Sequence, residues 1–155
     1  MERYRHTQIG YLLLVALGGA LALILCLMLI TGFNWVAAIV SIILAGCLWI
    51  FATLTVTLDG NKLEVRFGPG FIRKSFLLRD IAAHRVVTNP GYYGWGIRLI
   101  PGGWLYNVSG LQAVELQMVN GQRYRIGTDD AEGLALAIEQ ARRSGSGTRN
   151  PFFHH

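Results

Sequence analysis

The chain has 155 residues, of which 52% are hydrophobic and 15% are charged, and its formal net charge is +5. The mean hydropathy of +0.39 and the low charged fraction argue against an ordinary soluble protein, in which about 25% of residues are charged. The basic residues are scattered and no nucleic-acid-binding motif accompanies them, so no nucleic-acid partner is expected. Cys26 and Cys47 lie inside hydrophobic runs without Cys or His neighbours at ligand spacing, which favours small apolar side chains over a disulfide or a metal site.

Residues 9–58 contain no formally charged side chain. A short polar stretch at residues 31–34 divides the apolar part into two runs, 9–30 and 34–53. The first run has about 22 residues and extends ~33 Å as a helix, which is enough to cross the hydrocarbon core of a bilayer. It is too long for a signal peptide and leads into a second run, so we expect it to be retained. The sequence predicts a transmembrane helical hairpin over residues 9–53.

The orientation of this hairpin follows from the positions of the basic residues. Arg3 and Arg5 precede the first run, within a polar N-terminal segment over residues 1–8, and the connection between the runs has no charge. Four basic residues follow the second run: Lys62, Arg66, Arg73 and Lys74. The positive-inside rule therefore predicts a multi-pass protein with both termini in the cytoplasm.

Small side chains lie along one side of each predicted membrane helix and permit close contact between helices. They are Gly18, Gly19 and Ala22 in the first helix and Ala37, Ser41 and Ala45 in the second. Packing within the hairpin is the favoured explanation, and packing against another membrane protein is the alternative. Because neither run contains an ionisable Asp, Glu, Lys or Arg, transport by this chain alone is not expected.

The hydrophobic period changes to two after the second run. Leu54, Val56 and Leu58 alternate with threonine, and a turn at residues 59–62 leads into a second alternating strand. No linker separates the second run from this strand, so we expect the domain to keep a fixed angle to the membrane. Further strands are predicted over residues 71–76, 83–88, 95–100, 103–108, 114–118 and 122–126. The pattern gives seven or eight mainly antiparallel strands in all.

A helical period follows the last predicted strand. Asp129 with Glu132 three residues later is similar to a capping box, and the sequence predicts a helix over residues 130–143. Its apolar positions at helical spacing are Leu134, Ile138 and Ala141. We expect this helix to cover the open end of the sheets. Residues 144–155 have the composition of a flexible tail, and the two terminal histidines are either native or part of a purification tag.

Several short motifs resemble small bacterial membrane proteins with a pleckstrin-homology-like (PH-like) domain. They lie at residues 94–98 (GWGIR), 101–110 (PGGWLYNVSG), 114–116 (VEL), 120–121 (NG) and 124–130 (YRIGTDD). The resemblance implies a PH-like barrel or sandwich over residues 54–143, capped by one C-terminal helix and anchored in the bacterial inner membrane by two N-terminal helices. It carries over no catalytic residue. Phosphoinositide-binding PH domains use a basic loop between the first strands, but residues 59–62 hold one acid and one base, which argues against that ligand.

Two groups of residues are candidates for binding. A dense aromatic set is a candidate interaction surface, although packing in the core is the favoured explanation: Tyr92, Tyr93, Trp95, Trp104 and Tyr106. A candidate basic face, for which a solvated strand surface is favoured over an anion site, consists of Arg73, Lys74, Arg123 and Arg125. The glycine-rich residues 91–96 lack the parallel strand and helix that a phosphate loop requires.

No catalytic constellation, cofactor site or metal site is predicted, since Asp80 and His84, four residues apart, have no nucleophile placed nearby. The sequence favours a non-enzymatic membrane protein whose cytoplasmic domain mediates protein–protein interaction or assembly, as an accessory subunit of a membrane complex. Its expected partners are membrane lipids and either another membrane protein or a second copy of the chain. The alternative function is sensing of the membrane surface or of anionic lipid by the basic domain.

Overall fold

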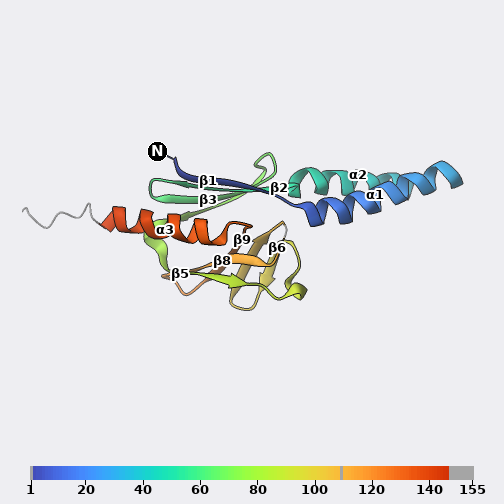
Figure 1. Ribbon diagram of the computed structural model, residues 1–155. Helices are drawn as coiled ribbons and strands as arrows, with labels where there is room; N and C mark the ends of the chain where they lie inside the picture. The colour runs from blue at the N-terminus through green and yellow to red at the C-terminus, as the bar shows by residue number, and fades with distance from the viewer. Residues whose placement is uncertain (1, 109, 147–155) are drawn as a thin grey trace, which may run out of the picture.

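The computed structural model describes residues 2–108 and 110–146 (Figure 1). Two helices near the N-terminus extend from one end of a body built of two β-sheets and a C-terminal helix. The sheets and the C-terminal helix are together called the β-domain below. Residues 147–155, which include most of the predicted tail and the two terminal histidines, lie outside the described residues.

The helix pair consists of α1 (Tyr11–Thr31) and α2 (Trp35–Phe51). The two helices run side by side and are joined by only three residues (Figure 1). Asn34 begins α2 by capping it, because its Oδ1 accepts hydrogen bonds from the backbone N–H groups of Val36 at 2.9 Å and Ala37 at 3.1 Å. The two helices begin and end within a few residues of the two apolar runs, 9–30 and 34–53.

A strand that the sequence pattern did not indicate precedes the helices. Residues 2–8 do not form a separate segment but belong to β1 (Glu2–Ile9), which pairs antiparallel with β2 (Thr53–Asp59). Thr7 and Thr55, 48 residues apart in the chain, lie opposite each other with their hydroxyl oxygens 3.0 Å apart. The backbone N–H of Gly10 donates to the carbonyl of Ala52 at 2.7 Å, which closes the pairing at the helices. The helix pair is thus an insertion between neighbouring strands of one sheet.

In the described part of the chain, nine strands form two sheets, where seven or eight were expected. The first sheet has the order β1-β2-β3-β4 and the second has the order β5-β8-β9-β7-β6. All neighbours are antiparallel except β7 and β9, which pair in parallel. The remaining strands are β3 (Lys62–Phe67), β4 (Ile72–Leu77), β5 (Ile81–Thr88), β6 (Gly96–Ile100), β7 (Gly103–Asn107), β8 (Gln112–Met118) and β9 (Arg123–Gly127). Short 3₁₀ helices follow β4 (η1, Leu78–Asp80) and β5 (η2, Gly91–Tyr93).

The core lies between the two sheets and under the C-terminal helix. Period-two alternation puts one apolar face of each strand inward, as predicted for β2 and β3. The largest fully buried side chains are Phe67, Leu54, Leu58, Leu63, Leu105, Leu116, Ile126, Leu134, Ile138, Val65, Val108 and Val114. Most of the predicted apolar strand positions are therefore core positions.

The helix α3 (Ala131–Ser146) contacts β5, β8, β1 and η1. Leu134, Ile138 and Ala141 are buried, as their helical spacing predicts. The N-cap is Asp130 and not the predicted Asp129, because the Asp130 Oδ1 accepts from the backbone N–H of Gly133 at 3.3 Å. Asp129 and Asp130 also hold β1 against α3, because each of them contacts a side chain of β1.

Tyr4 and His6 on β1 each contact one of these aspartates. The Tyr4 hydroxyl donates to the Asp130 Oδ2 at 2.8 Å, and the His6 ring contacts the Asp129 carboxylate. Burial, together with the hydrogen bond to Asp130, raises the pKa of Tyr4 above its ordinary value. Asp130 therefore links the start of α3 to the strand that leads into the helix pair.

The substitution Asp130→Ala is expected to lower the free energy of unfolding by about 2 kcal/mol, because it removes an N-cap worth about 1 kcal/mol and a hydrogen bond worth about 1 kcal/mol. The matched variant Asp129→Ala retains both interactions and is expected to lose less. Urea unfolding followed by tryptophan fluorescence measures the two losses. An equal or larger loss for Asp129→Ala would contradict the assignment of the cap to Asp130.

Candidate interaction surfaces

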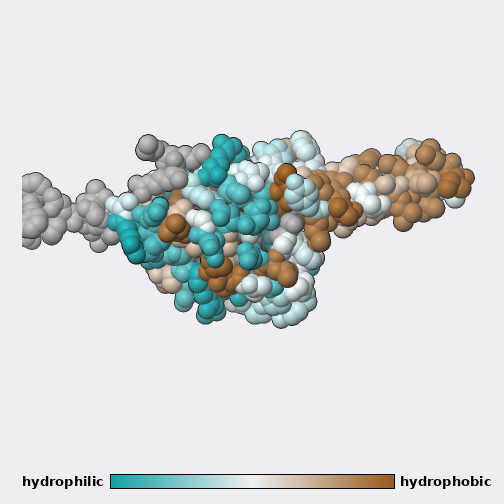
Figure 2. Space-filling model, in the orientation of Figure 1, coloured by the Kyte–Doolittle hydropathy of each residue, from teal (hydrophilic) through white to brown (hydrophobic). Residues whose placement is uncertain are grey.

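The surface of the helix pair is apolar and uncharged. No residue of α1 is buried, and large side chains on both helices are exposed, with Leu29 at 88%. Figure 2 shows that hydrophobic residues cover the helix pair, whereas the visible face of the β-domain is mainly hydrophilic. By length and composition α1 is able to cross a membrane, and α2 is a shorter apolar helix of 17 residues. An apolar surface of this extent is characteristic of contact with a membrane or a partner.

The six small residues predicted at the helix contact fall into two groups. Ser41 is the buried residue of α2, and Ala37, one turn earlier, is partly buried. The residues that are exposed, or at which an added Cβ meets no atom within 4 Å, are Gly18, Gly19, Ala22 and Ala45. Packing within the pair therefore accounts for Ala37 and Ser41 but not for the other four.

The aromatic set that the sequence grouped together is divided between two places. Tyr92, Tyr93 and Trp95 lie in the loop between β5 and β6, where Tyr92 is 84% exposed. The Tyr93 ring lies 5.6 Å from the guanidinium carbon of Arg125. The Trp95 indole N–H donates to the carbonyl of Gly110 at 3.1 Å, so this loop is tied to the loop between β7 and β8. Tyr92 is thus the exposed aromatic residue of this loop, and Tyr93 and Trp95 are partly exposed.

The other two members of the set lie on β7. Tyr106 is only 8% exposed and packs between the rings of Phe67, at 6.2 Å, and Tyr124, at 6.4 Å. Burial raises its pKa, and its assignment to an interaction surface is wrong. Trp104 is partly exposed and lies directly opposite the exposed Leu99 of the edge strand β6. The sequence pattern did not single out Leu99, because alternation alone does not distinguish an edge strand from a central strand.

The predicted basic face is not one surface. Arg73 and Lys74 are adjacent in β4, so their side chains point to opposite faces of the strand. Lys74 lies over an aromatic ring of the second sheet, with its Nζ 5.6 Å from the centre of the Tyr124 ring. Arg123 is exposed on β9, but the Arg125 side chain is only 17% exposed and is bound to an acid. The four residues therefore do not form a shared anion site.

Glu115 is the acid that binds Arg125. Its side chain is 6% exposed, and its Oε2 accepts from Arg125 Nε at 2.8 Å while its Oε1 accepts from Arg85 Nη2 at 3.0 Å. Arg125 Nη1 also donates to the Asn89 side-chain oxygen at 3.0 Å. Burial alone raises the pKa of Glu115, but the hydrogen bond and charge of Arg125, with the charge of Arg85, outweigh burial and lower it. This network fixes the start of the aromatic loop on the sheet.

Asp80 and His84 do not form a pair. Asp80 lies 4.0 Å from Arg79, whereas His84 contacts Arg142 at 3.4 Å and Glu139 at 3.7 Å on α3. Burial, followed by the charge of Arg142, lowers the pKa of His84. Over residues 2–108 and 110–146, no group of three or more His, Cys, Asp or Glu side chains is placed to hold a metal ion. The contacts of His84 with Arg142 and Glu139 attach α3 to β5.

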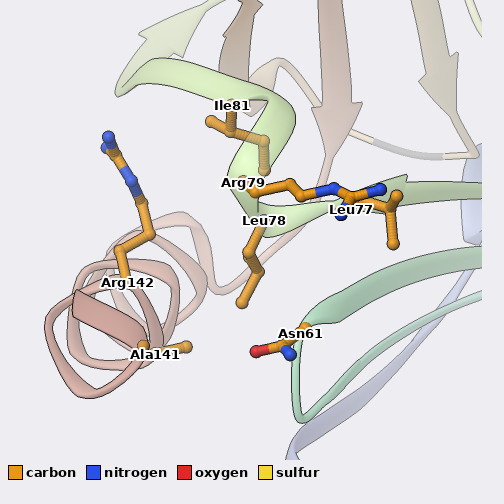
Figure 3. Close-up of a pocket in the computed structure, with 8 residues that line it drawn as sticks. Asn61, Leu77, Leu78, Arg79, Ile81, Ala141 and Arg142 are labelled. Carbon is orange, nitrogen blue, oxygen red and sulfur yellow. The ribbon is translucent and has the colours of Figure 1, made fainter. Parts of the chain in front are cut away.

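A pocket of about 530 Å³ lies between η1, the turn between β2 and β3, and the last turns of α3. The side chains of Leu78, Ala141 and Asn61 converge on it, while the guanidinium of Arg142 extends away (Figure 3). The complete lining is Asn61, Leu77, Leu78, Arg79, Ile81, Ala141, Arg142 and Gly145. Its chemistry is that of an apolar hollow with basic residues at its rim, and its lining contains no nucleophile paired with a base.

Comparisons with protein-family models, with curated proteins and with solved structures gave no match to this chain. Three surfaces of the chain are the candidates for binding. These are the apolar helix pair, the exposed aromatic loop and the exposed Leu99–Trp104 pair at the edge of the second sheet.

The substitution Glu115→Gln is expected to lower the free energy of unfolding by about 3 kcal/mol at neutral pH, because two arginines lose a largely buried carboxylate. A lowered pKa in the folded state means that this stabilisation is present above the ordinary value of 4.5 and is lost as the pH falls through the folded value. The difference between the two proteins is therefore expected to shrink below about pH 4.5.

Urea unfolding at a series of pH values measures this difference. The control is Glu64→Gln, which removes a surface carboxylate that lies 3.3 Å from Lys62 and is expected to change stability by less than about 1 kcal/mol. A difference between wild type and Glu115→Gln that stays constant with pH would contradict the role given to the Glu115 charge.

Proposed function

We propose that this chain is a non-enzymatic membrane protein in which α1 and α2 cross the bilayer as a hairpin and hold the β-domain at the membrane surface. The helix pair supports this because its exposed side chains are apolar and residues 9–58 contain no formal charge. As helices, α1 extends about 32 Å and α2 about 26 Å, lengths close to the hydrocarbon thickness of a bilayer. The basic residues on both sides favour cytoplasmic termini, and the resemblance to bacterial PH-like proteins favours the bacterial inner membrane.

The β-domain is proposed to be a PH-like interaction module. Two packed sheets and a single C-terminal helix are the arrangement that the resemblance implies. The observation that carries the proposal is the insertion of the helix pair between β1 and β2. Because both ends of the insertion belong to the same sheet, the domain presents fixed surfaces to other membrane proteins. A fixed scaffold with exposed aromatic residues suits assembly with a partner better than it suits catalysis.

A second candidate function is sensing of anionic lipid. It is favoured by two arginines on the outer face of the first sheet, Arg66 and Arg73, which lie opposite each other.

A test on the isolated domain from residue 54 onward would remove β1 and expose the edge of β2. The full-length chain is therefore the right material for any binding measurement.

The membrane topology is testable with single cysteines in a Cys26→Ser, Cys47→Ser background. Phe33→Cys, in the connection between the helices, is expected to react with a membrane-impermeant maleimide in spheroplasts. Arg79→Cys, on an exposed side chain of the β-domain, is expected to react only after the membrane is permeabilised. Equal labelling of both cysteines in intact spheroplasts would contradict the proposed hairpin.

The assembly function is testable by gentle-detergent affinity capture of the full-length protein from its native membranes. A stoichiometric membrane protein or a second copy of the chain is expected in the captured complex. Leu99→Asp is expected to weaken capture by about 30-fold, which corresponds to ~2 kcal/mol for a central interface residue. The matched control is Val119→Asp, which adds the same charge at an exposed turn. Recovery of the protein alone, with no partner and no second copy, would contradict this function and leave lipid sensing as the alternative.

A further inference from the structure

The turn between β3 and β4 is packed against the end of α2, where the proposed membrane surface lies. A Cβ built on Gly68 would lie 2.6 Å from the carbonyl oxygen of Ile50 and 2.7 Å from that of Trp49. Only glycine, here with φ +51°, allows this approach of the two backbones. The Gly68 N–H also donates to the carbonyl of Thr53 at 2.9 Å. The turn is therefore held in place by backbone contacts.

Two arginines lie side by side immediately beyond this turn. Arg66 on β3 and Arg73 on β4 are direct cross-strand partners, an arrangement in which like charges repel and destabilise the pair. Within residues 2–108 and 110–146, no carboxylate oxygen lies within 4.0 Å of either guanidinium, whereas Lys62 and Arg125 have acidic partners. The fold thus keeps two adjacent positive charges without a protein anion between them.

Both arginine side chains lie against Gly70 in this turn. A Cβ on Gly70 would lie 2.8 Å from the Arg66 Cδ and 3.3 Å from the Arg73 Nη2. The Arg73 Nε donates to the Gly70 carbonyl at 2.9 Å, which orients this guanidinium. The remaining N–H donors of two neighbouring guanidinium groups match the oxygens of a phosphate, which arginine binds in a bidentate manner.

Exposed aromatic residues flank the arginines on the side of the helices. Phe71 in the turn and Trp49 near the end of α2 are both exposed, and their rings meet edge to face with centroids 5.5 Å apart. Aromatic residues of this kind gather at the interface between hydrocarbon and water. The Trp49–Phe71 pair is apolar and lies beside two arginines that have no acidic partner among the described residues. A phospholipid, which has both an anionic phosphate and apolar chains, complements this surface better than a soluble anion does.

We propose that Arg66 and Arg73, with Trp49 and Phe71 beside them, form a binding site for the phosphate of an anionic membrane lipid in the leaflet that faces the β-domain. This inference rests on the proposed membrane insertion of α1 and α2. The phosphate lies between the two guanidinium groups and relieves their repulsion, and the aromatic pair contacts the upper part of the acyl region.

The test uses the full-length protein in nanodiscs that contain phosphatidylglycerol and phosphatidylcholine, with native mass spectrometry of the lipid retained after transfer to detergent. Preferential retention of phosphatidylglycerol is expected for wild type. Arg66→Gln and Arg73→Gln are each expected to reduce this preference by ~5-fold, since a basic residue near an anionic surface contributes ~1 kcal/mol. The charge-matched control is Arg79→Gln in η1, at the other end of β4, which is expected to leave the preference unchanged.

The variant Arg73→Glu separates lipid binding from folding. It puts a carboxylate opposite Arg66, so it is expected to maintain or increase stability in urea while it reduces phosphatidylglycerol retention by more than the neutral variants do. Retention that is unchanged in Arg73→Glu would overturn the site. Saturable binding of soluble glycerol phosphate by the detergent-solubilised protein without lipid would overturn the assignment to a lipid.

Alkaline carbonate extraction distinguishes a failure of this site from a failure of the proposed function. Extraction of the wild-type protein from membranes would contradict the membrane insertion on which the inference rests, and with it the site. A protein that resists extraction, yet retains phosphatidylglycerol and phosphatidylcholine equally, would contradict the lipid site alone.

Discussion

The pairing of β1 with β2 is the constraint on which the rest of the structure depends. The chain leaves the sheet at Ile9, forms both apolar helices and returns to the neighbouring strand at Thr53. Gly10 closes the insertion, because a Cβ there would lie 3.0 Å from the carbonyl oxygen of Phe51 and from the Cβ of Val108. Rotation of the β-domain against the helices would therefore break the ladder between β1 and β2 or separate this close packing. The helix pair is joined to the β-domain by two chain segments, one from β1 into α1 and one from α2 into β2. Two such connections resist bending between the helices and the β-domain more strongly than a single linker does.

This constraint gives each end of the β-domain a different environment. The turn between β3 and β4 and the loop between β7 and β8 lie beside the helices, as the contacts of Gly68 and Val108 demonstrate. The pocket next to η1 lies at the opposite end of β4 and is lined by the last turns of α3. If the helices cross a bilayer, the first set of loops faces lipid headgroups and the pocket faces the aqueous side. With the helices in a bilayer, the fold would therefore separate a surface suited to lipid from surfaces available to a protein partner.

Local periodicity was sufficient to predict most strands and both kinds of helix, because each of these elements buries a regular apolar face or is apolar throughout. It failed for β1, whose inward side chains Tyr4, His6 and Gln8 include no aliphatic residue and whose partner is distant in the chain. The parallel pairing of β7 with β9 also depends on distant residues. The separation of Arg73 from Lys74 follows from strand alternation and was predictable. The burial of Tyr106 agrees with the core packing favoured for the aromatic set, but the sequence could not separate Tyr106 from the exposed members, because an aromatic residue on a strand fits a core or a surface equally well.

The two arginine pairs of the β-domain show why an unneutralised pair points to a ligand. Arg85, Glu115 and Arg125 lie in one row across β5, β8 and β9, so the carboxylate stands between two positive charges and stabilises the sheet. In the first sheet, the row that contains Arg66 and Arg73 continues through Thr55 to Thr7 and includes no acid. A structural role alone would be served better by an acid at one of these two positions, because opposite charges across strands attract. The repulsion between Arg66 and Arg73 is lowest when an external anion occupies the gap. If α2 crosses a bilayer, the nearest source of anions to this turn is the lipid headgroup surface at the end of α2.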